Sequence, residues 1–271
     1  FVPYVSSILL PLTLISYVFP FLDGFLFFFI KIIEVLSQFL NSFDILKFSM
    51  CKMNVLMIGI YFVIVCRLFI LWNSKRIRYL CLLLCFFVVH FLMPFRNNDY
   101  VMFFDVGQGD SALINVNKNV TLIDTGGMVS FDDSEYKYKI AKNKIIPYLK
   151  ANGIRKIDNM ILTHGDADHM KEAVYIANNF KVDKVIFNCG EFNSLENELV
   201  DVLKRRNISY SSCVNEVVVD KYRLKFLNSG IYDNENDNSS VIYFKYDDYK
   251  FLFMGDAGVN RENDILNKYK L

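Results

Sequence analysis

The chain has 271 residues, a formal net charge of +1 and a hydrophobic fraction of 53%, which is high for a soluble protein. The first third raises this fraction, because residues 1–98 are dominated by Phe, Leu, Ile and Val. Residues 99–271 carry 22 Lys and Arg against 26 Asp and Glu, a net charge of −4 that excludes the basic footprint expected of a DNA-binding domain. Composition therefore predicts two parts, 1–98 and 99–271.

The sequence of residues 1–98 predicts transmembrane α-helices. Four apolar runs approach the length that crosses a bilayer, namely 1–22, 25–40, 53–72 and 79–95. Pro3, Pro11 and Pro20 interrupt the first run, and such breaks are tolerated at membrane depth where a segment lines a channel. The second run either spans or lies at the interface as an amphipathic helix. A large buried helical core is the alternative to a membrane segment.

The basic residues of the first part predict its orientation. Lys75, Arg76 and Arg78 lie between the last two apolar runs, and short basic loops favour the cytoplasmic side. The chain after Arg96 is then outside the cytoplasm. We therefore expect a multi-pass protein of the cell membrane whose C-terminal domain is extracytoplasmic.

The second part predicts an α/β domain, because short apolar strands alternate with helical segments. Strands are expected over 101–106, 112–116, 120–124, 157–163, 184–187, 216–227, 241–246 and 250–254. Helices are expected over 139–152, 171–179 and 195–206. Pro147 is expected to weaken the first of these helices, and Gly153 to end it. This order suits a sandwich of two mixed sheets covered by helices.

The segment Thr163–His169 holds two of the three His residues of the chain together with Asp166 and Asp168. It directly follows the apolar run Met160–Leu162, so it is a loop at the end of a strand. Imidazole suits Zn, Mn or Fe, and carboxylate oxygen shifts the preference toward harder cations. A structural loop is the less favoured interpretation of this density of ligand groups. The segment therefore predicts a metal site.

The same segment resembles the His-x-His-x-Asp-His pattern of the metallo-β-lactamase superfamily, with Asp166 in place of the second His. The runs Phe104–Ser111, Leu122–Gly127 and Phe251–Asp256 look like further landmarks of one branch, the C-terminal domain of ComEC-type competence proteins, which are bacterial DNA-uptake channels. Residues 1–98 are similar to the end of the channel domain of those proteins. The resemblance implies an αββα sandwich over 99–271, incomplete at its C-terminus, where the last His of the superfamily would follow Leu271.

The resemblance also implies the residues of a site with two divalent ions. The metal ligands would be His164, Asp166, Asp168, His169 and Asp256, with Asp256 bridging the ions. Asp124 would orient a ligand His through a hydrogen bond. Asn238 and Ser239 stand near the place of the family's mid-domain His, which has no counterpart in this chain.

The expected catalytic residues are Asp168, Asp256, Asp105 and Asp110. The last two flank a tight turn, and stabilisation of that turn is an equally good interpretation.

We expect a membrane component of DNA uptake whose hydrolase domain is a metal-dependent phosphodiesterase or nuclease acting on single-stranded or duplex DNA. The oxygen-rich ligand set favours Mn over Zn. The alternative is a non-catalytic, degenerate hydrolase fold that gates or guides DNA. The expected partners are DNA, the membrane and the rest of the competence channel, and no oligomeric state is predicted.

Two further features leave alternatives open. Lys137, Lys139, Lys142 and Lys144 are interleaved with Tyr136 and Tyr138 and suit either single-stranded DNA or, more simply, a solvated helix face. Cys189 and Cys213 match no zinc site, and we expect free thiols in preference to a disulfide.

Overall fold

The computed structural model describes residues 15–17, 19–41, 55–70, 76–92, 99–127, 140–219 and 222–269, together with the single positions 13 and 53. The chain divides into two compact units, 1–49 and 50–271. The division expected after residue 98 stays a prediction, and residues 93–98 lie outside the described part of the chain.

The N-terminal third is helical where it is described. The first unit contains η1 (Pro20–Leu22) and α2 (Asp23–Asn41), on which Lys31 and Glu34 form an ion pair of 2.8 Å. The second unit begins with α3 (Val55–Ile70) and α4 (Arg76–Leu92). These two helices pack against each other, and the Tyr61 ring meets Phe86 edge to face at 4.8 Å between centroids.

The predicted transmembrane spans are not confirmed. Across the described ranges, no helix has both the length and the apolar character needed to cross a membrane. Helices α3 and α4 hold 16 and 17 residues, whereas a crossing takes about 20 residues at 1.5 Å per residue. Residues 1–12 of the first predicted span and the predicted cytoplasmic residue Lys75 lie outside the described residues.

The α/β part contains a mixed sheet of six strands in sequential order. Its strands are β1 (Tyr100–Phe103), β2 (Ala112–Val116), β3 (Asn119–Ile123), β4 (Ile157–Ile161), β5 (Val182–Phe187) and β6 (Ser209–Ser212). The first three strands pair antiparallel, and β3 to β6 pair parallel. The β2–β3 hairpin turns at Asn117 and Lys118, both with positive φ, as two-residue hairpin turns require.

One face of this sheet is covered by helices. They are the π-helical turn η3 (Ala141–Ile145), α5 (Ile146–Ala151), α6 (Ala167–Met170), α7 (Ala173–Asn179) and α8 (Ser194–Arg206). Leu122, Met160 and Val185 point into this layer. Their neighbours Ile123, Ile161 and Ile186 point to the opposite face, because side chains alternate along a strand. The sheet is therefore buried on both faces, as parallel strands require.

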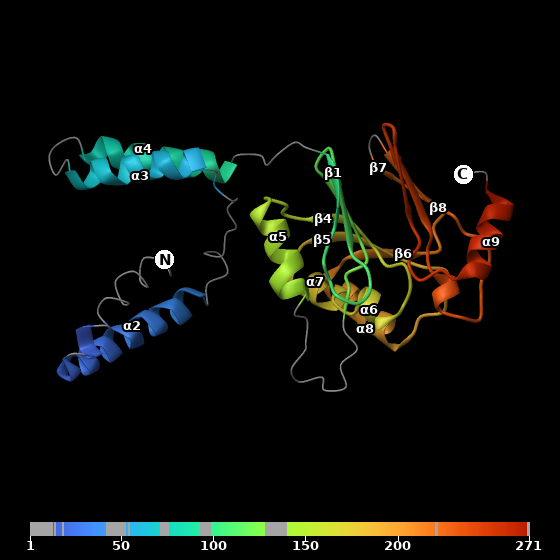
Figure 1. The fold of residues 1–271 in the computed structure, drawn as a ribbon, viewed down its shortest axis with the longest axis horizontal. Coiled ribbons are helices and arrows are strands. Elements are labelled where there is room, and N and C mark those ends of the chain that lie inside the picture. Colours follow the sequence, from blue (N-terminus) through green and yellow to red (C-terminus); the bar gives the residue numbers. More distant parts are fainter. Residues whose placement is uncertain are drawn as a thin grey trace. The chain divides into compact units, whose positions relative to one another are not determined.

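A second, antiparallel sheet packs on that opposite face. Its order is β10-β9-β8-β7, with β7 (Glu216–Val219), β8 (Tyr222–Phe226), β9 (Ile242–Tyr246) and β10 (Tyr249–Phe253). Helix α9 (Val259–Lys268) packs outside this sheet through Ile265, which contacts Leu227 and Val241. Figure 1 shows the resulting layers, with α5 to α8 on one side and β7, β8 and α9 on the other. The predicted α/β sandwich is therefore confirmed.

Several element boundaries differ from the prediction. The helix expected over 139–152 is divided just before Pro147 into the π-helical turn η3 and α5, so the irregularity expected at this proline is present. The run 216–227 is a hairpin of two strands, and β6, η4 (Asn236–Asn238) and α9 were not predicted. Residues 136–139, which suit either single-stranded DNA or a solvated helix face, lie outside the described residues.

Candidate metal centre

Asp124 is the buried anchor of the site. It follows β3 with a φ of +54° and is 1% exposed. Its carboxylate accepts hydrogen bonds from the backbone N–H and the hydroxyl of Thr163, at 2.8 and 2.7 Å. The same carboxylate lies 3.0 Å from Nδ1 of His169. Asp124 therefore ties the end of β4 to helix α6.

The two His rings are held with their Nδ1 atoms engaged. The Thr163 hydroxyl donates its single proton to Asp124, so it accepts from Nδ1 of His164 at 3.1 Å. Nδ1 of His169 donates to Asp124, because a carboxylate only accepts. Both rings are buried, and their centroids lie 4.3 Å apart. These contacts leave the Nε2 atoms of both rings free for another ligand.

Asp256 meets the His pair from the second sheet. It follows β10, and its Oδ1 lies 3.0 Å from Nε2 of His169. Nε2 of His164 and Nε2 of His169 are buried and form no hydrogen bond with any described residue. Ligand atoms of His164, His169 and Asp256 all lie within 4.8 Å of one another, a spacing that one metal ion can bridge.

Two glycines allow this convergence. Gly109 has a φ of +80°, and a Cβ built on it would lie 1.9 Å from the carbonyl oxygen of Asp168. The loop between β1 and β2 can therefore approach α6 only without a side chain at this position. Gly255 has a φ of +54°, and its Cβ would lie 2.8 Å from the Thr163 hydroxyl.

The remaining predicted carboxylates fall into two groups. Oδ2 of Asp166 lies 3.6 Å from Nε2 of His164, and the charge of Asp168 acts on His169. Asp110 also faces this group: burial raises the pKa of its carboxyl, and the charges of Asp124, Asp256 and Asp168 add to this while His169 opposes it. Asp105 points elsewhere, since its carboxylate is 90% exposed and pairs with Lys144 at 3.0 Å.

The site carries a strong negative potential. Burial lowers the pKa of His169, but the hydrogen bond and charge of Asp124 and the charges of Asp256 and Asp168 outweigh it. The pKa of His169 is thereby raised to about 9. A proton and a metal ion would compete for this nitrogen, because a ligand imidazole must be neutral.

Asn238 and Ser239 lie behind Asp256 and do not join the ligand group. The Ser239 hydroxyl accepts a hydrogen bond from the backbone N–H of Asp256 at 3.2 Å. The Asn238 side chain bonds to both backbone polar groups of Tyr232, at 2.8 and 2.6 Å. They support the loop that precedes β9, which in turn supports Asp256.

Several supporting residues were missed at the level of sequence. Thr163 positions both Asp124 and His164. Glu172 is buried and accepts from the backbone N–H groups of Ile140 and Ala141, so it caps the η3 segment. The pattern of strands and loops carries no signal for these roles, because they depend on tertiary contacts.

A third buried carboxylate lies beside the metal loop. Glu196 closes a capping box with Asn193 at the start of α8, and the Asn193 side chain donates to the carbonyl of Gly165 at 2.7 Å. Burial and the negative charges of Glu235 and Asp166 raise the pKa of Glu196 to about 7. The hydrogen bond from the backbone N–H of Asn193 opposes this rise. Glu235 in turn accepts from the N–H of Gly165 at 2.9 Å.

The two cysteines of the α/β domain form a disulfide, which corrects the expectation of free thiols. Cys189 and Cys213 are bonded across the ends of β5 and β6. Neighbouring Asn188 donates to the Glu235 carboxylate at 3.4 Å and to the Asn238 carbonyl at 3.3 Å. The bridge therefore fixes a loop that supports the metal site.

The fold and the site together define a member of the metallo-beta-lactamase superfamily, whose family model matches residues 104–270. The chain belongs to this family, whose fold is that of a metal-dependent hydrolase.

Among curated proteins the chain is similar to ComE operon protein 3 of Bacillus subtilis, with 26% identity over 177 residues, 61% of this chain and 23% of that protein. It is also similar to competence protein ComA of Neisseria gonorrhoeae, with 34% identity over 74 residues, 27% of this chain and 9% of that protein. These matches confirm the resemblance to ComEC-type competence proteins, and the chain spans less than a quarter of either relative's length.

Among solved structures, a diphosphatase from the PhnP family matches with 16% identity and a TM-score of 0.32, over 50% of this chain and 48% of that one. A score of this size carries no argument about activity.

Proposed function

We propose that the α/β domain is a metal-dependent phosphodiesterase that cleaves DNA during its uptake. One observation carries the proposal. Nε2 of His164 is buried without a hydrogen-bond partner among the described residues, and Nε2 of His169 lies 3.0 Å from the Asp256 carboxylate. A buried polar atom without a partner costs about 1–3 kcal/mol. A divalent cation would satisfy both nitrogens at once.

The donors present fit such an ion. His164, His169 and Asp256 would hold the first ion through two nitrogens and one oxygen. Asp166 and Asp168 would contribute oxygens to a second ion, with Asp256 between the two. This oxygen-rich set suits Mn more than Zn in our proposal, because carboxylates favour harder cations.

Each protein group then has a defined task. When bound, a divalent ion supplies a water of lowered pKa and a positive charge for phosphodiester oxygens. Asp124 holds the His169 ring by its Nδ1 proton and so keeps Nε2 turned to the ion. The side chain of Asp256 is 39% exposed, so a substrate would reach it from solvent. We assign Asp110 and Asp168 as further catalytic carboxylates and withdraw Asp105, because it pairs with Lys144.

DNA is proposed as the substrate because the two curated relatives are competence proteins. Residues 99–271 have a net charge of −4, so the domain surface does not attract a polyanion. We therefore propose that DNA is delivered by other parts of the uptake machinery and held at the site mainly by the metal charge.

A non-catalytic domain that guides DNA is the second candidate. Among the described residues, the ligand group holds two imidazoles, His164 and His169, and otherwise carboxylate oxygens. A set of this kind binds transition metals less tightly than a His-rich one.

Metal content and cleavage of DNA decide between the two. The chain is incubated with Mn²⁺ or Zn²⁺, freed of excess metal, and assayed for bound metal and for hydrolysis of labelled single-stranded and duplex DNA. We expect bound metal and cleavage, and loss of both in His169→Ala and Asp256→Ala. Asp201→Asn, an exposed change on α8, serves as the control and retains both. Bound metal without cleavage of either DNA selects the non-catalytic candidate, and no bound metal contradicts both metal-site proposals.

We further propose that the α/β domain works outside the cytoplasm. The Cys189–Cys213 disulfide supports this, because disulfides persist in oxidising compartments. A place for the N-terminal helices against a membrane is part of the same proposal. Its support is the apolar side chains exposed on α3 and α4, among them Leu56, Phe62 and Leu84.

A further inference from the structure

A second cavity lies at the open edge of the sandwich. It has a volume of about 510 Å³ and is lined by residues of β1 and β2 from one sheet and of β9 and β10 from the other. Strands β1 and β10 are edge strands, so the sandwich is not closed there. The cavity adjoins the start of both strands, whereas Asp110 and Asp256 follow their ends. It is therefore distinct from the metal centre.

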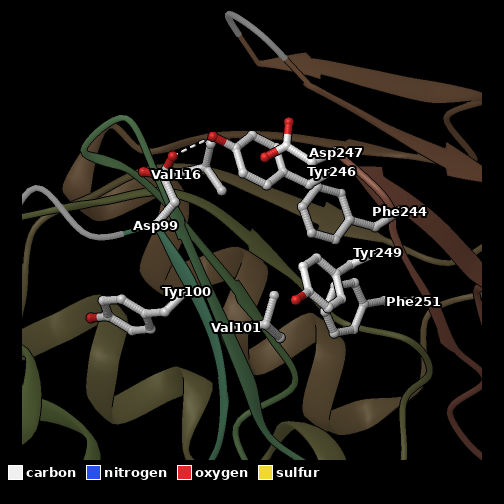
Figure 2. A pocket seen from close by; sticks show the side chains of 9 residues that line it. All are labelled: Asp99, Tyr100, Val101, Val116, Phe244, Tyr246, Asp247, Tyr249 and Phe251. Carbon is white, nitrogen blue, oxygen red and sulfur yellow. Dashed lines mark hydrogen bonds between the residues drawn. The ribbon is translucent and has the colours of Figure 1, made fainter.

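Aromatic rings form one wall of this edge pocket. Figure 2 shows Phe244, Tyr246, Tyr249 and Phe251 gathered opposite Val101. The rings of Phe244 and Phe251 stack at 5.6 Å with an interplanar angle of 24°, and Phe244 and Tyr246 stack at 6.3 Å. Tyr249 is 71% exposed. The pocket thus offers ring faces to a ligand.

Two carboxylates complete the pocket. Asp99 accepts hydrogen bonds from the hydroxyl of Tyr246 and from the backbone N–H of Asn117. The hydrogen bond to Asp99 raises the pKa of Tyr246 to about 12, so the phenol stays neutral. Asp247 lies exposed in the β9–β10 turn. None of the described lining side chains is cationic, so the pocket carries negative charge against aromatic faces.

We propose that the edge pocket binds an organic cation, and specifically a guanidinium group. A cation over an aromatic face is attracted by the negative face of the ring. A planar guanidinium also stacks on such faces and donates to carboxylates in its own plane. Tyr246 and Tyr249 provide the faces, because the Phe244 ring is fully buried behind them, and Asp247 provides the acceptor. A nucleotide would stack equally well, but its phosphate would be repelled by the two carboxylates.

The test uses two ligands of nearly the same shape, one cationic and one neutral. N-acetylarginine amide and N-acetylcitrulline amide are titrated into the full chain, and the NMR shifts of labelled Tyr rings are followed. We expect saturable binding of the arginine compound and binding of the neutral citrulline compound that is at least about tenfold weaker. Equal binding of the two compounds, or preferential binding of thymidine 5′-monophosphate, overturns the proposal.

Variants locate the binding. Asp247→Asn removes the charge while keeping the shape, and Asn tolerates the positive φ of 49° at this position. Tyr249→Leu removes a ring. Both variants should weaken arginine binding by at least about fivefold. Asp248→Asn, at the neighbouring exposed turn position outside the pocket lining, should leave it unchanged. An equal loss of arginine binding in Asp248→Asn would overturn the assignment of the site to the edge pocket, because the loss would then follow from the net charge of the protein.

A peptide arm identifies the source of the cation. Acetyl-Val-Arg-Val amide can also pair with the free edge of β10. If the tripeptide binds more tightly than N-acetylarginine amide, the natural ligand is an Arg side chain of a peptide. If the two bind equally, the natural ligand is a free guanidino compound. Failure of the tripeptide to bind contradicts the proposal.

Discussion

The carboxylate of Asp124 lies 3.0 Å from Nδ1 of His169, and Asp256 lies 3.0 Å from Nε2 of the same ring. One imidazole therefore links a fully buried carboxylate of the first sheet to a partly exposed carboxylate from the second. The hydrogen bond between Nδ1 and Asp124 fixes the direction in which Nε2 points.

Asp124→Asn should reduce metal affinity by about 10- to 100-fold. The carboxylate accepts from the Thr163 backbone N–H on one oxygen and from Thr163 Oγ1 and His169 Nδ1 on the other, whereas an Asn amide has one oxygen and turns its NH₂ group toward one side of these donors. Calorimetric titration with Mn²⁺ and Zn²⁺ measures the effect, with Asp201→Asn as the surface control. Unchanged affinity in Asp124→Asn would show that this hydrogen bond does not orient a ligand.

Gly109→Ala should lower metal affinity and stability far more than Gly107→Ala. Both glycines have a positive φ, +80° and +83°, so both alanines carry the same left-handed strain of about 1–2 kcal/mol. Only the Cβ at residue 109 meets another atom, the Asp168 carbonyl oxygen at 1.9 Å, whereas nothing lies within 4 Å of the other. Urea denaturation and metal titration of the two variants separate the effect of the close contact with Asp168 from the effect of backbone strain. Equal effects would place the loop away from α6.

Glu196→Gln should flatten the pH dependence of stability. The folded-state pKa of Glu196 is raised from 4.5 to about 7, so its stabilising contribution is full below about pH 4.5 and is lost as pH rises through 7. Gln keeps the capping box but has no charge to bury. The variant should therefore match the wild type near pH 4.5 and exceed it by about 1–3 kcal/mol above pH 7. Urea midpoints from pH 4.5 to 8 measure this, with exposed Glu198→Gln as the control, and parallel profiles for all three proteins would contradict it.

Replacing both Cys189 and Cys213 by Ser should cost about 2–4 kcal/mol of stability, because the bridge closes a loop between positions 24 residues apart. Metal affinity should fall as well, since Asn188 loses its anchored loop. Alkylation before and after reduction, followed by intact mass measurement, should reveal two extra thiols only after reduction. Labelling of both cysteines without reductant would contradict the bridge and the extracytoplasmic proposal that rests on it.

The local sequence pattern was sufficient to predict those helices and strands that carry strong turn residues or clear apolar runs. The β2–β3 hairpin follows from the turn at Asn117 and Lys118, and the helix expected over 195–206 is α8, which begins one residue earlier. Strand β6 was missed because Ser209–Ser212 is polar and lies at a sheet edge. Helix α9 was missed because its sequence is mostly polar, with only Arg261 and Ile265 buried.

The site was predictable where its residues carry a local signal, either a dense cluster or a recognisable landmark. His164 and His169 stand out through their local density, and Asp256 through its place after an apolar strand. Asp105 was grouped with Asp110 because they are neighbours in sequence. Gly107 and Gly109, both with positive φ, turn the chain between them. The disulfide depends on a Cα separation of 4.3 Å that no spacing along the chain predicts.

The placement of Asp256 after β10 has a consequence for biosynthesis. The two His residues leave the ribosome long before this carboxylate, and the hairpin β9–β10 must add to the second sheet before the three groups meet. Long-range pairing of this kind forms slowly. On the proposed function, a nascent domain would therefore lack the complete ligand group until β10 has paired with β9.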